Sequence, residues 1–234
     1  SRILAVFDHK NKDIYEVQTE DGRKCECGLE HLWSYKIGND AYKEEVTDGL
    51  ETGELSDIIS LIDNGSDVFI PIAMAVMFKR KEYALPPFTL GMLLADGGMR
   101  QYVGILSDEE QGYICNIGLD CESNSLFIPE EYLFGSIVQR SELLTGIVDR
   151  CGHLDAQNRP HIYVKSKRLS NDILYLCRSL GYIVYADIEE GFHHICIHTQ
   201  DKIFSDAYMR SQHRRNAAKQ GYVEQENRNF VKVK

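Results

Sequence analysis

The sequence has no long apolar run, and this absence excludes a membrane-spanning helix. No hydrophobic stretch reaches the roughly 18 residues that cross a bilayer, and no secretory signal opens the chain. The 234 residues carry a formal net charge of −10, so the chain lacks the basic excess that favours non-specific binding to nucleic acid. We therefore expect a globular, monomeric protein in the cytoplasm, with no membrane partner.

Paired metal-binding cysteines are missing as well. The seven cysteines are scattered along the chain and form no C-x-x-C motif. Cys25-Glu26-Cys27 is too tight for a zinc knuckle. The cysteine pattern therefore argues against a zinc ribbon and favours reduced thiols in an intracellular protein.

The first part of the chain is predicted to be rich in β-structure. "DIYEVQTEDGRKCECG" alternates apolar and polar residues around Asp21-Gly22, which is typical of a hairpin. "LEHLWSYKI" predicts a further strand, and "LSDIISLIDNG" a short helix with Ser56 as its N-cap and Gly65 as its end. Because Ser1 lies within a predicted strand, "RILAVFD", we expect the chain to be a piece of a longer protein.

The second part is predicted to mix helices and strands. Pro86-Pro87 marks the start of a helix. "QYVGIL" and "GYICNIG" predict two strands joined by "SDEEQ", and "IPEEYLFGSIVQRSELLTGIVDRCG" is mostly helical. A strand "HIYVKS", an amphipathic helix "RLSNDILYLCRSLG", a hairpin of "YIVYAD" and "HHICIHT", and a final strand "FVKVK" complete the pattern.

An internal repeat carries the chemical signal. "TLGMLLADG" (89–97) and "LTGIVDRCG" (144–152) share a glycine at the third position, large aliphatic residues next and a glycine at the ninth. Glycine on a helix face lets a second helix approach closely. Two such helices side by side bring their C-terminal ends together, where paired acids can hold a divalent metal over a phosphodiester.

The two nonapeptides resemble the motifs of the LAGLIDADG homing endonucleases. The segments around the second nonapeptide resemble those of intein-borne members. "DIYEVQTEDGRKCECGLEHLW" is similar to block B of the Hint splicing domain, and "ENRNFVKVK" resembles the strand that re-enters that domain. These stretches cover more than half of the chain in the order of an intein.

The resemblance implies an α+β protein made of a β-rich Hint-type portion and a two-repeat α/β LAGLIDADG domain. Residues 1–84 would form the Hint-type portion and connector, 85–216 the endonuclease-like domain, and 217–234 the return strand. The implied reaction is Mg²⁺-dependent cleavage of double-stranded DNA in an intein-free host gene. The flanking intein segments and the host protein are the implied protein partners.

Residue by residue, Asp96 takes the place of the first catalytic, metal-binding carboxylate. His31 takes the place of the block-B histidine, which activates the N-terminal scissile peptide. Gly91 and Gly146 would mark the interface between the motif helices. Asp149 matches an acid often seen in these motifs, but it would point away from the metal.

Several positions depart from the family pattern. Cys151 stands where the second metal-binding acid belongs, and a thiolate is a poor ligand for magnesium. Gly28 replaces the usual block-B threonine, and only 55 positions separate Gly97 from Gly152, which is short for the first half. The splicing nucleophile and the terminal His-Asn pair of an intein are not among these residues.

Each candidate also has a purely structural interpretation. Asp96 can be a helix-terminal aspartate in an Asp-Gly turn, Cys151 a small buried residue, and His31 a core histidine beside Trp33. "HHICIH" places His194 and His198 on one strand face around Cys196, a conceivable zinc site without an evident fourth ligand.

Basic residues at three places could contact DNA phosphates, although a solvated face explains each cluster separately. They are Lys79, Arg80 and Lys81; Lys165, Lys167 and Arg168; and Arg210, Arg214 and Arg215.

Three functions follow from this interpretation. The first is an intein-encoded homing endonuclease with a degenerate second motif. The second is a catalytically dead remnant that serves only as the scaffold of a splicing element, as Cys151, the short first half and the acidic charge favour. The third is a free-standing DNA-binding regulator built on the same fold.

Overall fold

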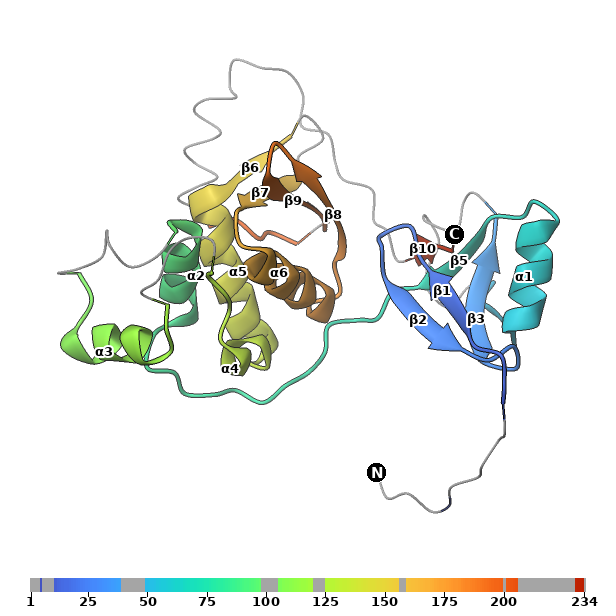
Figure 1. Ribbon diagram of the computed structural model, residues 1–234, viewed down its shortest axis with the longest axis horizontal. Coiled ribbons are helices and arrows are strands. Elements are labelled where there is room, and N and C mark those ends of the chain that lie inside the picture. The colour runs from blue at the N-terminus through green and yellow to red at the C-terminus, as the bar shows by residue number, and fades with distance from the viewer. Residues whose placement is uncertain are drawn as a thin grey trace. The chain divides into compact units, whose positions relative to one another are not determined.

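The computed structural model describes an α+β protein that divides into two compact units (Figure 1). Unit 1 consists of Ser1–Pro71 together with Asn229–Lys234, and unit 2 of Ile72–Arg228. No described helix is long and apolar enough to cross a membrane. The structure describes residues 5, 11–38, 49–97, 105–119, 125–155, 159–199, 201–205 and 230–233.

Unit 1 contains the predicted hairpin and a four-stranded antiparallel sheet. The hairpin pairs β1 (Tyr15–Gln18) with β2 (Lys24–Cys27). The strand order of the sheet is β10-β5-β3-β4, where β3 is Leu32–Ile37, β4 Glu51–Glu54, β5 Val68–Pro71 and β10 Phe230–Lys232. The final strand β10 pairs with β5, so unit 1 is built from chain segments on both sides of unit 2.

The helix of unit 1, α1 (Leu55–Asp63), begins two residues earlier than the sequence predicts. Glu54, and not Ser56, is the N-cap, because the Glu54 side chain accepts from the backbone of Asp57 and the Asp57 carboxylate accepts from the Glu54 N–H. A capping box of two acids thus replaces the usual Ser/Thr–Glu pair. Leu55 and Ile58 then face the core of the unit.

Unit 2 packs helices on one face of a second antiparallel sheet. Its helices are α2 (Pro87–Ala95), α3 (Asp108–Asn116), α4 (Glu130–Leu133), α5 (Ile137–Cys151) and α6 (Lys167–Ser179). The sheet order is β6-β7-β9-β8, formed by β6 (Gly152–Leu154), β7 (Pro160–Val164), β8 (Ile183–Glu189) and β9 (Phe192–His198). The predicted helix at 168–181 and the hairpin after it are therefore confirmed.

The predicted strand at 112–118 is wrong, because most of it lies in helix α3. Ser107 accepts from the Glu110 N–H, and the Glu110 carboxylate accepts from the Ser107 N–H, so a capping box starts a helix within "SDEEQ". Acidic residues in the first turn also favour the helix. These local signals override the β-propensity of Tyr113 and Ile114. Most of the other predicted strand, 101–106, lies outside the described residues.

The sheet of unit 2 belongs entirely to the segment around the second nonapeptide. Within the described residues of 72–136, no β-strand occurs, whereas the second repeat has four strands. The core joins both repeats, because Leu90 and Leu93 of α2 are buried in the same cluster as Leu143, Ile147 and the inner face of the sheet. The first repeat thus contributes helices to a core whose sheet comes from the second.

Buried Arg140 fixes the first turns of α5. Its guanidinium donates to the Gly135 carbonyl at 2.9 Å and to the Ser179 carbonyl at 2.6 Å, and it also bonds the Val76 carbonyl. These contacts join the start of α5 and the end of α6 to residues 72–86, the connector that leads into α2. Each donated bond satisfies a backbone oxygen, which offsets the cost of burying the charge.

Candidate functional site

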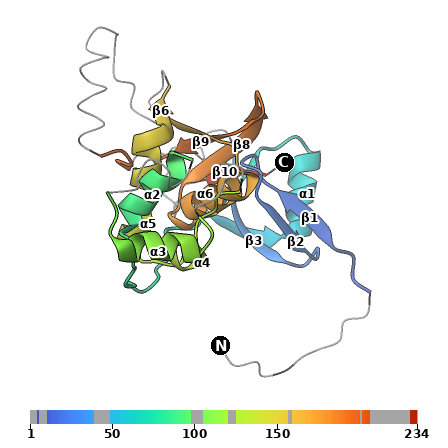
Figure 2. The same ribbon diagram turned by 60° about the vertical axis from the view of Figure 1, so that its left-hand side comes forward.

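The two nonapeptides form helices that cross at their glycines, as the repeat predicts. A Cβ built on Gly91 of α2 would lie 3.0 Å from the Gly146 Cα and 2.3 Å from the Leu143 carbonyl oxygen of α5. A Cβ on Gly146 would lie 2.2 Å from the Phe88 carbonyl oxygen. The helix backbones are therefore in direct contact, and Figure 2 shows α2 and α5 side by side, as Figure 1 does. No larger residue fits at either position without separating the helices.

Asp96 lies at the end of α2, next to this crossing. It is the C-cap residue of α2, and only 8% of its side chain is exposed. Its Oδ1 atom bonds the Arg150 Nε atom of α5, and 44% of the Arg150 side chain is exposed. The carboxylate predicted to hold metal is therefore paired with a guanidinium from the second nonapeptide. The guanidinium compensates the negative charge of the nearly buried carboxylate, so no cation from solution is needed there.

Cys151 is the last residue of α5, and its thiol is neutral near pH 7. Burial, together with the nearby negative charge of Asp96, raises the pKa of the Cys151 thiol to about 12. The Sγ atom lies 3.4 Å from the Ile147 carbonyl oxygen, to which the thiol donates. A neutral thiol offers magnesium neither charge nor a hard oxygen.

Asp149 is occupied by a contact on another side of α5. Its Oδ1 atom accepts from the Ser205 N–H at 2.9 Å. This bond anchors the described segment 201–205, which includes buried Ile203 and Phe204, against α5. The predicted interface residues Gly91, Gly146 and Cys151 thus gather near Asp96, whereas the Asp149 carboxylate is directed to the chain that follows the sheet.

The predicted DNA-contacting residues lie on the connector and near the start of α6. Lys79 and Arg80 are exposed on the connector, and Lys81 Nζ donates to the Glu131 carbonyl at 3.2 Å. Lys165, Lys167 and Arg168 are exposed around the start of α6. The Arg168 Cζ atom lies 3.8 Å from the centroid of the Phe127 ring. The Lys165 Nζ atom lies 5.6 Å from the centroid of the Phe192 ring. Arg210, Arg214 and Arg215 lie outside the described residues.

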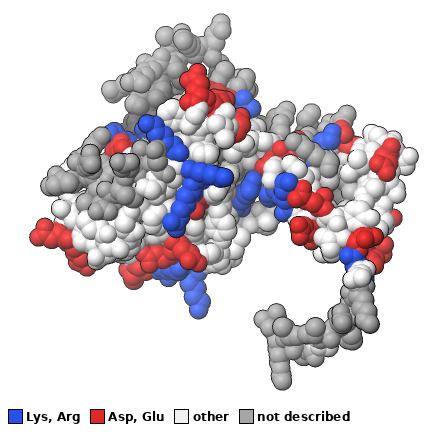
Figure 3. Space-filling model, in the orientation of Figure 1, with Lys and Arg blue, Asp and Glu red and all other residues white. Residues whose placement is uncertain are grey.

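On the face drawn in Figure 3, lysine and arginine side chains are interspersed with acidic ones. The four strands of the unit 2 sheet contain no lysine or arginine at all. The outer face of that sheet instead carries histidine, tyrosine, cysteine and acidic side chains, and sequence reasoning did not assemble this group.

His31 lies in unit 1 immediately before β3 and is exposed to solvent. Its ring meets the Trp33 ring edge-on, with centroids 5.5 Å apart. The His31 N–H donates to the Gly28 carbonyl at 3.1 Å, and its own carbonyl accepts from the Leu55 N–H at 3.0 Å. The histidine is thus beside Trp33 as the alternative interpretation has it, but it is not a core residue.

Arg150 is a residue of the candidate site that the sequence analysis does not identify. The signal was present, since Arg150 lies in the second nonapeptide directly before Cys151. Its partner could only be identified once the helix crossing brought the two nonapeptide ends together.

Comparison with known proteins gives one distant relative and no family. No protein-family profile matches the chain. The chain is similar to the replicative DNA helicase DnaB of Mycobacterium intracellulare, with 28% identity over 203 residues. The similarity covers 73% of this chain but only 35% of that helicase, so the chain corresponds to about a third of its relative.

Proposed function

We propose that the chain is part of an intein in which a LAGLIDADG-type domain is inserted in the sequence of a Hint-type splicing fold. The nuclease centre of this domain lacks the ligands that magnesium needs. The observation that carries this proposal is the glycine-to-glycine crossing of α2 and α5, with Asp96 at its end. Such a contact at the equivalent positions of two nonapeptides is hard to explain by chance composition, because every other residue type is excluded there.

The construction of unit 1 supports the splicing part of the proposal. Its sheet is completed by β10, which pairs with β5 after the whole of unit 2 has intervened in the chain. A further bridge joins Thr19 to Val233. A domain nested within a β-rich unit is the arrangement that the resemblance implies for an intein carrying an endonuclease.

The comparison supports a replicative helicase as the host protein. A helicase motor binds ATP through the phosphate loop G-x-x-x-x-G-K-[ST], and the 234 residues contain no such motif. We propose that the matched third of the relative is an insertion of the same kind, and that the chain interrupts a replicative helicase.

The residues at the helix ends do not fit magnesium. One carboxylate, that of Asp96, is already paired with Arg150, and the opposing position offers the neutral Cys151 thiol. Magnesium is held by hard oxygen ligands in near-octahedral geometry. We therefore propose that magnesium takes no part at these helix ends and that the endonuclease-like domain serves as a folded part of the splicing element.

A splicing assay tests the function directly. The chain, with its flanking intein segments restored, is placed between two reporter proteins, and ligation of the reporters is followed by gel electrophoresis. We expect splicing, and we expect His31→Ala to stall the first acyl shift, so that precursor accumulates. Glu30→Gln is the control, since Glu30 is the exposed neighbour of His31. Unchanged splicing in His31→Ala would remove His31 from the mechanism, and no ligation by any form would reject the splicing function.

A further inference from the structure

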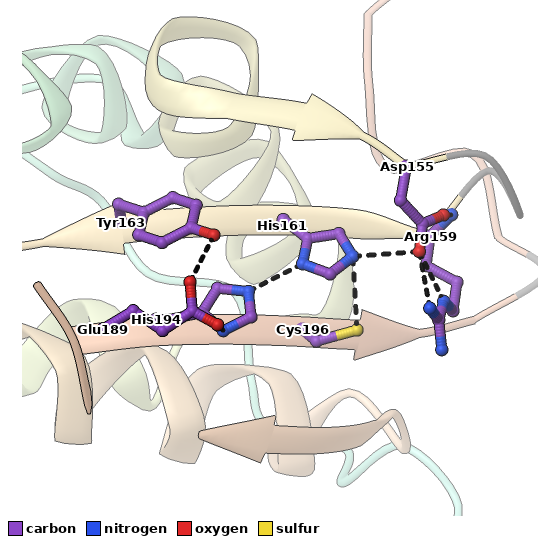
Figure 4. A network of polar contacts seen from close by, with 7 residues as sticks. All are labelled: Asp155, Arg159, His161, Tyr163, Glu189, His194 and Cys196. Carbon is purple, nitrogen blue, oxygen red and sulfur yellow. Dashed lines mark hydrogen bonds and ion pairs between the residues drawn. The ribbon is translucent and has the colours of Figure 1, made fainter. Parts of the chain in front are cut away.

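The outer face of the unit 2 sheet carries a connected group of ionisable side chains (Figure 4). The strand register explains the group. Tyr163 of β7 lies directly opposite His194 of β9, and His194 lies opposite Asp187 of β8. Side chains at paired positions of antiparallel strands project from the same face. Residues far apart in the sequence are thus brought together on the face that α5 and α6 leave uncovered.

From this arrangement we propose that Asp187, Glu189 and His194 form a binding site for a transition-metal dication, with zinc as the best fit. The His194 Nδ1 atom lies 2.8 Å from Asp187 Oδ1 and 3.3 Å from Glu189 Oε1. The three ligand atoms all lie within 4.8 Å of one another. Zinc bonds to imidazole nitrogen and carboxylate oxygen at about 2.0–2.2 Å, which needs ligand atoms roughly 3–3.5 Å apart. Only small movements of the two carboxylates would complete this geometry.

The three proposed ligands differ in how deeply they are buried. His194 is 8% exposed and held in the middle of the sheet, whereas Asp187 and Glu189 lie on the solvent side and can adjust. Tyr163 donates to Glu189 Oε2 at 2.9 Å, which leaves Oε1 directed at His194. Tyr163 and Glu189 also line a shallow surface hollow with Phe192, so an ion can enter from solvent.

The second ring nitrogen of His194 has the hydrogen-bond partner that a metal-bound histidine requires. The His194 Nε2 atom lies 2.7 Å from His161 Nδ1, and the His161 Nε2 atom lies 3.1 Å from Asp155 Oδ2. When a metal takes the lone pair of His194 Nδ1, the ring proton is at Nε2 and is donated to His161. His161 then donates its own Nε2–H to Asp155. Both rings are neutral in this arrangement and every contact has one donor and one acceptor.

Without a cation, the same row of contacts requires an additional proton. His194 Nδ1 must carry a proton to bond Asp187, His161 Nε2 must carry one to bond Asp155, and a third must lie between the rings. A divalent ion at Nδ1 would take the place of the proton on that atom, and the remaining two protons would then satisfy the row of contacts. The Cys196 Sγ atom lies 3.7 Å from His161 Nε2, so this thiol contacts His161 and is not one of the three grouped ligands.

The chemistry of the ligands separates this site from magnesium. An imidazole with two carboxylates suits zinc, cobalt or manganese, while magnesium prefers oxygen alone. Three protein ligands also leave a fourth position for water. The proposal is independent of the splicing function and of the α2–α5 helix ends, since none of its residues takes part in either.

Calorimetric titration of the whole chain with Zn²⁺ tests the site. We expect one ion per chain at this site, with affinity reduced at least about tenfold by Asp187→Asn, whose exposed position leaves the fold intact, and more by His194→Gln. His161→Gln should weaken binding by about 10–100-fold if it positions His194. His193→Gln is the matched control, because residue 193 lies on the same strand and points to the opposite face of the sheet.

Cobalt absorption distinguishes this site from binding by cysteines. Co²⁺ held by nitrogen and oxygen should give weak visible bands without the intense sulfur-to-metal charge-transfer band that Cys25 or Cys115 would produce. Circular dichroism checks that each variant is folded. The proposal is overturned if Asp187→Asn and folded His194→Gln bind Zn²⁺ as the unmodified chain does, or if the cobalt spectrum shows sulfur ligation that these variants leave unchanged.

Discussion

Arg150 of α5 is paired with the carboxylate of Asp96, across the point where the C-terminal ends of the two nonapeptide helices meet. Asp96 is nearly buried there, and a nearly buried carboxylate requires a partner of opposite charge. The resemblance to LAGLIDADG motifs implies a metal ion as that partner. In this chain a side chain of the second repeat supplies it, and the Cys151 thiol next to Arg150 supplies no second acid.

Replacing the crossing glycines tests the helix contact. Gly91→Leu or Gly146→Leu should lower the free energy of unfolding by about 3 kcal/mol or more, because the new side chain would meet backbone atoms of the other helix that cannot yield. Gly112→Ala is the control, since a Cβ at this position of α3 meets no atom within 4 Å. It should be neutral or stabilise by up to about 1 kcal/mol. Urea unfolding measures all three, and a neutral Gly91→Leu would show that the helices are not in contact.

A double substitution should allow Mg²⁺ to bind at the ends of α2 and α5. In Arg150→Gln/Cys151→Asp, the guanidinium is removed and a second carboxylate is placed beside Asp96, so Mg²⁺ should bind where the unmodified chain binds none. Calorimetry with Mg²⁺ measures the difference, and Cys151→Asp alone should bind more weakly because Arg150 still competes. Arg159→Gln, which removes an arginine paired with Asp155 elsewhere in unit 2, is the control. If the double variant binds no Mg²⁺, the loss is not confined to these two positions.

The Cys151 thiol should react slowly with alkylating agents. Its pKa of about 12 leaves almost no thiolate at pH 8, whereas Cys25 and Cys115 are exposed. Mass spectrometry of peptides after iodoacetamide treatment should show Cys25 and Cys115 modified long before Cys151. Labelling of Cys151 as fast as Cys25 in the folded chain would contradict its burial.

The same thiol makes a signed contribution to stability at high pH. Because the folded pKa lies above the ordinary value of 9.0, the folded state keeps its proton while the unfolded state loses it. Stability should therefore fall as the pH rises from about 9 towards 12, and Cys151→Ala should show a smaller fall over this window. Urea midpoints measured at pH 8 and pH 10 compare the two proteins. An equal fall in the urea midpoint of both proteins between pH 8 and pH 10 would show that Cys151 does not contribute.

Local signals predicted much of the secondary structure but not the pairing of distant segments. The Asp21-Gly22 hairpin, the Pro87 helix start and the amphipathic face of α6 follow from turn chemistry and periodicity, and each is confirmed. The sequence pattern predicts a loop between strands at "SDEEQ", whereas the Ser107–Glu110 capping box there starts helix α3. A capping box is a stronger helix signal than the few β-favouring residues after it are for a strand.

The sites depended on contacts that no single segment specifies. The repeat predicts that Gly91 and Gly146 meet, but not that Arg150 reaches Asp96, because this depends on the angle and offset of the crossing. Likewise, "HHICIH" indicates histidines on one strand face, but His161 and Asp187 come from neighbouring strands whose register only the folded sheet defines. Cross-strand neighbours lie outside any sequence window.

Cleavage of a plasmid is the most direct test of the central claim of the proposed function, that the α2–α5 helix pair carries no working nuclease centre. The substrate is a supercoiled plasmid with a replicative helicase gene that lacks the inserted segment, incubated with the unmodified chain and Mg²⁺. Gel electrophoresis separates supercoiled, nicked and linear forms. We predict that the plasmid stays supercoiled or is at most nicked on one strand, because Asp96 is paired with Arg150 and Cys151 provides no second acid. Efficient conversion to the linear form would contradict this account.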